Sequence, residues 1–271
     1  MSIDVLTGGR PSSAIAAPQR PFALVRHSAA LAKRSIIKLT RTPEAFIDVT
    51  LQPVIFLVLF VYIFGGAVAG STQEYLQFLL PGILAQTVAT TITIGVNLNS
   101  DMEKGVFDRF RSLPIGRSAP LLGAVFADVI RYVTICVVTL GFGYVMGFRI
   151  QTDAMSAVAG CLLAIGFAMC LSWVSVYIGM KARTSGAVQG ISFLVLLPLA
   201  FGSNVFVPIA TMPGWLQTFV NANPLTQLVS SVRGLFLGGP VAEHVGWTLV
   251  WMIVLVAVFM PLALRAYKKK A

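Results

Sequence analysis

Charge is scarce in this chain of 271 residues: 11% of the residues are Asp, Glu, Lys or Arg, whereas 56% are apolar. Soluble domains carry about 25% charged residues, so the composition excludes a water-soluble globule. The stretches without any charged residue are 49–73, 75–100, 154–180, 184–232 and 245–264. Each is long enough for a helix that crosses the hydrocarbon core, which takes about 20 apolar residues. The sequence therefore predicts an all-α integral membrane protein.

Motifs for catalysis and metal binding are also absent. The chain has no GxxxxGK[ST] phosphate loop, no HExxH and no GxSxG, and its only two histidines are His27 and His244. Cys136, Cys161 and Cys170 lie in apolar stretches without CxxC spacing, which favours neither a disulfide framework nor a zinc site. We therefore expect no enzyme activity, no metal and no cofactor in this chain. Uphill transport would then draw its energy from a partner or from an ion gradient.

Basic residues are present, and 17 of the 20 fall in every second connection between the apolar stretches, whereas the other connections hold only Arg149 and Arg233 and a span holds Arg131. Seven of the 20 Lys and Arg residues precede residue 42, four lie at 104–117, two at 181–183 and four at 265–270. Cytoplasmic loops of membrane proteins carry such an excess of positive charge. The pattern therefore predicts a multi-pass protein with both termini in the cytoplasm. The net charge of +10 is interpreted as a topology signal and not as a nucleic-acid-binding face.

We predict six transmembrane helices, preceded by an N-terminal arm. The spans are expected at about 49–68, 75–98, 119–147, 154–180, a fifth that ends near Val207, and 245–264, within a transmembrane domain of residues 43–271. Residues 1–20 are expected to be a disordered cytoplasmic tail. Residues 21–42 are expected to form an amphipathic helix on the inner leaflet, because basic and apolar residues fall on opposite sides of it. An ordinary cytosolic helix is the alternative.

Prolines divide the uncharged stretch 184–232, which is too long for one span and awkward for two. After the fifth span, two short helices at 214–222 and 225–237 are expected. We predict that they form a re-entrant outer-leaflet hairpin over 208–240, because irregular backbone at membrane depth persists only inside protein or beside water. Residues assigned to this region are Asn204, Pro208, Pro213, Trp215, Asn223, Pro224 and Arg233.

The connection at 101–114 is the most informative soluble segment. Val106, Phe110 and Leu113 recur at i, i+4 and i+7, which predicts a short amphipathic helix with one apolar edge. Such an edge on a cytoplasmic loop favours docking to a partner, whereas its aromatic residues could instead lie in the bilayer surface. The candidate docking residues are Glu103, Lys104, Val106, Phe107, Arg109, Phe110 and Leu113.

The second span contains a polar stripe about 60° wide, because its polar residues are spaced i, i+4, i+7 and i+11. The stripe consists of Gln86, Thr90, Thr93 and Asn97. It predicts either the wall of a translocation path or hydrogen-bonded helix packing, since both use polar side chains that avoid lipid. Phenylalanines such as Phe56, Phe60, Phe193 and Phe201 could line a path for a drug, but the interpretation favoured for each is contact with lipid or with the core.

Asp128 and Arg131 are the charges that lie well inside a span, at i and i+3 on one helix face. We interpret them as a structural pair. Charged residues inside a membrane are also functional candidates, and a proton relay through this pair would make the protein an ion-coupled carrier.

Several collinear motifs follow one another along the chain. They include Glu103-Lys-Gly-Val-Phe-Asp-Arg-Phe-Arg-Ser-Leu-Pro114, Ser203-Asn-Val-Phe-Val-Pro208, Met212-Pro-Gly-Trp-Leu-Gln217, Asn223-Pro-Leu-Thr226, Phe78-Leu-Leu-Pro-Gly82 and Arg233 followed by Gly238. Together these motifs resemble the ABC-2 type permease family, and in particular its daunorubicin-resistance permease subunits. The resemblance covers nearly everything after residue 40. It implies a six-span subunit that forms a homodimer and binds two separately encoded ATPase subunits, which hold the ATP and Mg. It also implies that the stretch containing Glu103 is the coupling region.

The resulting hypothesis is the permease subunit of an ATP-driven exporter in the cytoplasmic membrane of a prokaryote. The expected substrate is a hydrophobic or amphipathic compound of the drug type, as the resemblance implies, and membrane lipids surround the protein. The alternatives are a lipid or glycolipid exporter of the same kind, an ion-coupled secondary carrier and a non-transporting membrane scaffold. No nucleic-acid partner is expected.

Overall fold

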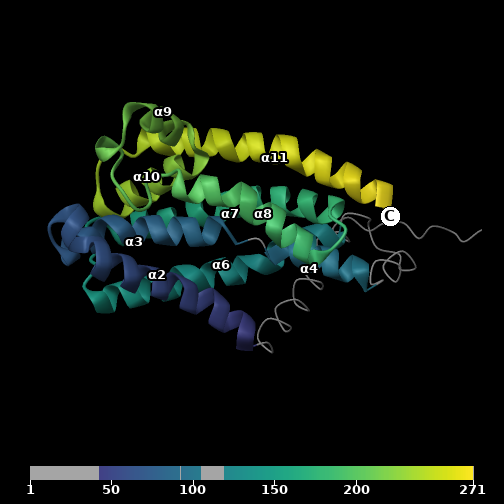
Figure 1. Cartoon of the computed structure of the whole chain (residues 1–271), viewed down its shortest axis with the longest axis horizontal. Coiled ribbons are helices and arrows are strands. Elements are labelled where there is room, and N and C mark those ends of the chain that lie inside the picture. The colour runs from purple at the N-terminus through teal and green to yellow at the C-terminus, as the bar shows by residue number, and fades with distance from the viewer. Residues whose placement is uncertain (1–42, 92, 105–118, 271) are drawn as a thin grey trace, which may run out of the picture.

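The computed structural model describes residues 43–91, 93–104 and 119–270. The helices are α2 (Pro43–Ala69), α3 (Thr72–Ala89), α4 (Thr93–Glu103), α6 (Ala119–Met146), α7 (Ala154–Lys181), α8 (Ser185–Phe201), the 3₁₀ turn η1 (Ile209–Thr211), α9 (Gly214–Ala222), α10 (Pro224–Leu237) and α11 (Ala242–Lys270). They form an elongated bundle (Figure 1), which confirms the all-helical prediction. The predicted tail at 1–20 and the helix predicted at 21–42 lie outside the described residues.

Five helical stretches of the described chain are long and apolar enough to cross a membrane: Thr50–Ala69, Thr72–Glu103, Asp128–Met146, Ala154–Lys181 and Ala242–Tyr267. They correspond to five of the six expected spans. The expected fifth span corresponds to α8, which is a shorter apolar helix of 17 residues. At 1.5 Å per residue, α8 is about 25 Å long, slightly less than the roughly 30 Å hydrocarbon core.

The fifth span ends earlier than predicted, at Phe201 instead of near Val207. The reason is a set of side chains that bind the carbonyl groups at the end of α8. The Asn223 amide nitrogen donates to Leu199 O at 2.8 Å and to Gly202 O at 2.6 Å, and the Ser203 hydroxyl donates to Ala200 O at 2.6 Å. These bonds satisfy carbonyl groups that a helix end leaves without an intrahelical partner.

The second span is not one continuous helix, contrary to the prediction for 75–98. Helix α3 ends at Ala89 and α4 begins at Thr93. Residues 90–94 are all β-branched, which lowers their helix propensity. In addition, the Thr90 hydroxyl donates to Gln86 O and the Thr91 hydroxyl to Thr87 O, each at 2.8 Å. Such local bonds compete with the helical ladder and bend helices.

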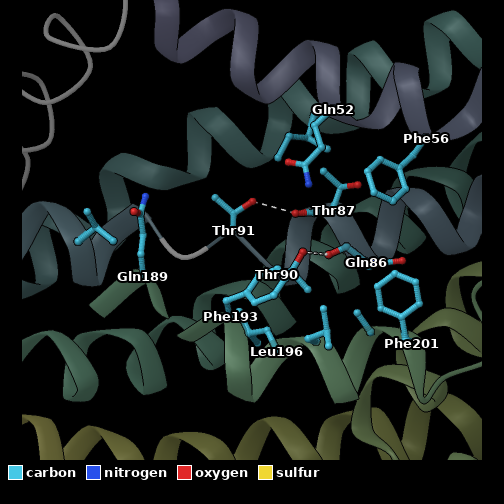
Figure 2. A pocket seen from close by; sticks show the side chains of 14 residues that line it. Gln52, Phe56, Gln86, Thr87, Thr90, Thr91, Gln189, Phe193, Leu196 and Phe201 are labelled. Carbon is cyan, nitrogen blue, oxygen red and sulfur yellow. Dashed lines mark hydrogen bonds between the residues drawn. The ribbon is translucent and has the colours of Figure 1, made fainter. Parts of the chain in front are cut away.

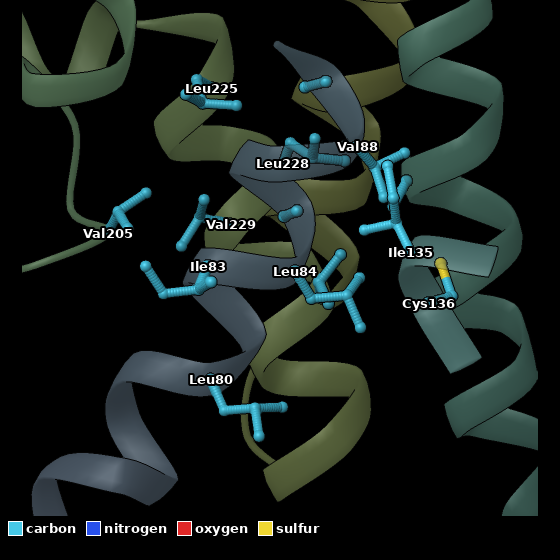
Figure 3. Packing of buried hydrophobic residues seen from close by; sticks show 14 of the residues in the cluster. Leu80, Ile83, Leu84, Val88, Ile135, Cys136, Val205, Leu225, Leu228 and Val229 are labelled. Atoms are coloured by element: carbon cyan, nitrogen blue, oxygen red, sulfur yellow. The ribbon is translucent and has the colours of Figure 1, made fainter. Parts of the chain in front are cut away.

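Helix α3 lies at the centre of the bundle and packs against α2, α6, α7 and α10. Its side chains Leu80, Ile83 and Leu84 are buried against α6 and α10, where Ile135 and Leu228 face them (Figure 3). Helix α11 packs along α7. Between helices in a membrane, this close packing stabilises mainly through van der Waals contacts, because lipid tails are as apolar as the side chains.

The α2–α3, α6–α7 and α10–α11 connections lie at the end of the bundle away from the C-terminus (Figure 1). A hydrogen bond joins the α2–α3 connection to the α6–α7 connection, since the side-chain amide of Gln73 donates to Gly147 O at 2.7 Å. The Thr152 hydroxyl donates to Leu235 O at 2.6 Å and so ties the second connection to the end of α10. These three connections therefore lie at one end of the bundle, and the outward position predicted for that end from the alternation of basic residues stays a prediction.

The two short helices expected within 208–240 are present as α9 and α10. Pro224 is the first residue of α10, a position at which proline is favourable because its missing N–H would have no helical partner. Helix α10 packs against α3, α7 and α11, so protein surrounds it. The re-entrant position of this pair in the outer leaflet remains a prediction.

Candidate functional site

A cavity of about 380 Å³ lies beside the break between α3 and α4 (Figure 2). Its walls come from α2, α3, α4, α6 and α8 together with the residues of the break. The lining contains no charged residue and combines amide and hydroxyl groups with aromatic rings and aliphatic chains. The polar residues of the lining are Gln52, Gln86, Thr87, Thr90, Thr91 and Gln189. Interrupted backbone inside a membrane is tolerated where it lines such a cavity.

The amide groups supply the hydrogen-bonding capacity of this cavity. Gln86 Oε1 is buried and has no hydrogen-bond partner within the described residues. By contrast, the hydroxyl hydrogens of Thr90 and Thr91 are already donated to backbone carbonyls. Each Gln amide offers both a donor and an acceptor. The cavity can therefore bind an uncharged ligand group through the amide groups of Gln52, Gln86 and Gln189.

Three phenylalanines complete the walls. Phe56 of α2 and Phe193 and Phe201 of α8 line the cavity (Figure 2), whereas the interpretation favoured from sequence placed them against lipid or in the core. Phe60 agrees with the favoured interpretation of contact with the core, because its ring packs on Phe206 with the ring centroids 4.5 Å apart. Phe193 also has 63% of its surface exposed, so the cavity opens toward the surface of α8. Flat aromatic walls favour stacking with a planar ligand.

The predicted polar stripe is divided by the helix break. Gln86 and Thr90 line the cavity together with Thr87 and Thr91, but Asn97 is exposed and is not part of the lining. The side chain of Thr93 lies outside the described residues. The stripe assumed 100° per residue throughout, and the break removes that phase relation between the two halves. Gln52 and Gln189 were missed, although each is an isolated amide in an uncharged stretch.

Helix α4 packs closely against α7. Gly95 and Gly179 let the two backbones approach, since a Cβ built on Gly179 would lie 2.5 Å from Gly95 O. The Gly95 N–H donates to Ser175 Oγ at 3.0 Å, and the buried Asn99 amide donates to Gly179 O at 2.8 Å and Ala182 O at 3.1 Å. Small residues and interhelical hydrogen bonds of this kind hold membrane helices together.

Glu103, the last residue of α4, faces α8. Its Oε1 accepts a hydrogen bond of 3.2 Å from the backbone N–H of Ser185, the first residue of α8. Lys104 is exposed. The other candidate docking residues, Val106, Phe107, Arg109, Phe110 and Leu113, lie outside the described residues, so the amphipathic helix expected there stays a prediction.

Arg233 of α10 links three parts of the bundle. Its Nε donates to Phe78 O at 3.1 Å and its Nη2 to Asn204 O at 3.0 Å, while its guanidinium lies 3.8 Å from the centre of the Phe78 ring. Asn204 in turn donates to Ser230 Oγ at 2.8 Å. Of the other residues assigned to this region, Asn223 joins α10 to the end of α8, and Trp215 has 76% of its surface exposed. Pro208 and Pro213 precede η1 and α9, respectively.

Asp128 and Arg131 lie one turn apart on α6, but the described residues contain no salt bridge between them. Asp128 Oδ2 and Arg131 Nε are both buried and lack a hydrogen-bond partner in the part of the chain that the structure describes. Arg131 as a whole is 7% exposed. The structural pair therefore stays a prediction, and the described geometry does not include its ion pair.

Comparison with known proteins gives a consistent result. A model of the family described as ABC-2 type transporter matches residues 27–237. The daunorubicin resistance ABC transporter permease protein DrrB1 of Streptomyces coeruleorubidus is 41% identical over 265 residues, which cover 97% of this chain and 94% of the relative. The doxorubicin resistance ABC transporter permease protein DrrB of Mycobacterium tuberculosis is 32% identical over 222 residues, or 76% of each chain. The putative transport permease ycf38 of Cyanophora paradoxa is 30% identical over 235 residues, which cover 83% of this chain and 77% of the relative.

Proposed function

The chain belongs to the ABC-2 type transporter family, and from this premise we propose that it is the permease subunit of an ATP-driven drug exporter. In this proposal it moves hydrophobic or amphipathic compounds out across the cytoplasmic membrane, with both of its termini in the cytoplasm. ATP is hydrolysed by a separate subunit. Two relatives bear names that refer to daunorubicin and doxorubicin resistance, so planar amphipathic drugs are the first substrates to test.

The observation that carries the proposal is the cavity beside the α3–α4 break. It is open toward the exposed side of α8, its lining as the structure describes it lacks charge, and it offers aromatic walls and the amide groups of Gln52, Gln86 and Gln189. A planar compound with a hydroxyl donor matches this chemistry, because its rings can stack on phenylalanine and its hydroxyl can donate to an amide oxygen. Ligand sites in proteins are generally concave, mostly apolar and supplied with a few such polar groups.

The proposal places the ATPase at the end of the bundle that holds the C-terminus. The segment 101–114 is its docking site there, with the apolar residues Val106, Phe110 and Leu113 as the anchors. Two ATPase subunits and two copies of this permease form the complex. Family membership supports this arrangement, and α4 ends at Glu103, within the docking segment.

Transport of doxorubicin into inverted membrane vesicles tests the proposed function. Co-expressed with its ATPase subunit, the wild-type permease should accumulate doxorubicin only when ATP is supplied. Gln86→Leu should raise the KM for doxorubicin about tenfold, because one lost hydrogen bond of roughly 1.4 kcal/mol changes affinity by that factor. Phe193→Ala should weaken doxorubicin transport as well, since it removes a stacking surface.

Leu194→Ala is the matched control, because Leu194 is the neighbour of Phe193 on α8, is exposed and does not line the cavity. It should transport like the wild type. Normal doxorubicin transport by both cavity variants would refute the assignment of the cavity. ATP-dependent movement of labelled lipid without movement of doxorubicin would support the lipid exporter instead. Transport that needs a proton gradient but no ATPase would support the ion-coupled carrier.

A further inference from the structure

We propose that Glu103 is a positioning residue that links the end of α4 to the first turn of α8, and so transmits movement of the ATPase-docking segment to the cavity wall. This inference rests on the proposed function, because it takes the segment after α4 as the place where the ATPase acts. It differs from the expectation that Glu103 contacts the ATPase directly.

Helix α4 is connected more firmly to α7 than to α3. Thr90 and Thr91 lie outside both helices, because α3 ends at Ala89 and α4 begins at Thr93, so α4 is not a rigid continuation of the central helix. On its other side α4 is fixed to α7, through the close approach of Gly95 and Gly179 and through the two hydrogen bonds from Asn99. A displacement at the end of α4 is therefore shared by α7 more directly than by α3.

Side chains from two parts of the chain accept hydrogen bonds from the N-terminus of α8. The first four N–H groups of a helix have no intrahelical acceptor. The hydroxyl of Thr184 accepts from Ala187 N at 3.2 Å and satisfies one of them. The carboxylate of Glu103 accepts a hydrogen bond of 3.2 Å from the N–H group of Ser185. Glu103 lies 82 positions before Ser185 in the sequence. A negative charge at this position is also favourable because a helix N-terminus is electropositive.

The contact between Glu103 and Ser185 lies at the start of the helix that forms one wall of the cavity. Gln189 lies one turn beyond Ser185 on α8, and Phe193 lies one turn further; both line the cavity. Because a helix transmits displacement along its axis, a movement of Glu103 at the start of α8 reaches these side chains. Glu103 therefore connects the docking segment to the cavity wall that α8 forms. The cavity wall that α3 forms stays in place, because the break separates α3 from α4.

Two pairs of variants separate this role from direct contact with the ATPase. Glu103→Gln keeps an oxygen acceptor for Ser185 N–H but loses the charge, whereas Glu103→Ala loses both. Ser185→Pro removes the N–H itself. Proline is tolerated at the first helical position, and Thr184 before it already has the extended backbone that proline requires, with φ −135° and ψ 153°. Ser185→Ala keeps the N–H and is the control.

The experiment measures doxorubicin transported per ATP hydrolysed, with the permease and its ATPase subunit in inverted vesicles, and the amount of ATPase that co-purifies. Glu103→Ala and Ser185→Pro should each lower the ratio by about fivefold or more, the low end of ordinary coupling between sites. ATPase co-purification should be unchanged. Ser185→Ala should stay close to wild type, and Glu103→Gln should lie between wild type and Glu103→Ala, because it keeps the acceptor and loses the charge. The double variant Glu103→Ala/Ser185→Pro should be no worse than either single variant, because both remove the same contact.

A second measurement needs no partner. In the purified permease, hydrogen exchange of the peptide covering residues 183–190 should be faster in Glu103→Ala than in wild type or Glu103→Gln. Equal defects in Glu103→Gln and Glu103→Ala, with loss of co-purifying ATPase, would show that the charge contacts the partner and would overturn the inference. So would a normal transport ratio in Ser185→Pro. Failure of the wild type to co-purify with an ATPase would contradict the proposed function, whereas the hydrogen-exchange result would still decide the contact.

Discussion

Arg233 shows how a single cation can be held inside this bundle by backbone carbonyls and an aromatic ring. Its guanidinium bonds Phe78 O of α3 and Asn204 O of the segment after α8, and it stacks on the Phe78 ring. The planar group presents several donors in a fixed fork. It can therefore satisfy two carbonyls from different elements at once, which a lysine ammonium on a flexible stem does less well.

We predict that Arg233→Lys lowers the midpoint of thermal unfolding in detergent by several degrees. Hydrogen bonds from a charged group contribute about 1.5–3 kcal/mol and a desolvated cation–π contact about 2 kcal/mol, and lysine retains only part of both. Arg149→Lys is the control, because Arg149 makes similar contacts with Tyr144 O, Phe148 O and the Tyr144 ring but is exposed. Equal midpoints for the two variants would show that Arg233 does not brace the bundle.

At the scale of the helix, α4 depends on residues that have almost no side chain. Gly95 faces the carbonyl and hydroxyl of Ser175, and a Cβ at position 95 would collide with both. Neither the backbone of α7 nor the hydroxyl that accepts from Gly95 N can move without breaking a contact. The close packing of α4 against α7 therefore requires glycine at position 95.

Gly95→Ala should therefore destabilise the protein by about 1–3 kcal/mol, the usual cost of forcing extra volume into a packed site. The measurement is folded yield and thermal unfolding in detergent. Gly141→Ala on α6 serves as the control: a Cβ there meets nothing within 4 Å, so this change should be neutral or slightly stabilising through helix propensity. Parallel results for the two alanine variants would contradict the close α4–α7 contact.

The start of α7 gives a prediction with a pH dependence. Asp153 accepts hydrogen bonds from Ser156 N at 3.1 Å and from the Ser156 hydroxyl at 2.7 Å, and these bonds hold the pKa of its carboxyl below the usual value. Because the folded-state pKa is lowered, the cap contributes stability above the unfolded pKa, about 3.9. That contribution is lost as the pH falls through the folded value.

Asp153→Ala should accordingly lower the unfolding midpoint at pH 7, and the difference from wild type should shrink on acidification below about pH 4. Asp153→Asn should keep most of the cap at neutral pH, because asparagine is an equally good N-cap residue. A difference between wild type and Asp153→Ala that stays constant down to pH 3 would show that the carboxylate does not act as a cap.

For the whole molecule, the arrangement of the connections predicts which residues face outward. Cysteines introduced at Ser71, Gln151 and Ala242, in a background without native cysteines, should react with an impermeant maleimide added to intact cells. Cysteines at Ser112 and Thr184 should react only after the membrane is opened. This follows from the positive-inside rule applied to the two ends of the bundle. External labelling at Ser112 would invert the topology and remove the basis for docking the ATPase there.

Much of this architecture follows from local sequence patterns. The uncharged stretches predicted the apolar helices, since a bilayer requires about 20 apolar residues for each crossing helix. The prolines predicted the short helices α9 and α10 to within one residue. The amides and hydroxyls of the second span indicated part of the cavity lining, because polar side chains in a membrane avoid lipid.

What the sequence alone determined was therefore the membrane class, the approximate positions of most apolar helices and the resemblance to the family, because these depend on composition, periodicity and local motifs. The tertiary structure decided the rest. It placed Gln52, Gln86 and Gln189 around one cavity, brought Glu103 to the first N–H of α8, and ended α8 with the amide of Asn223. Each of these depends on groups that are 21 to 137 positions apart in the chain. No local pattern encodes such distances, because they are set by how the helices pack once the break between α3 and α4 has changed the phase of the second span.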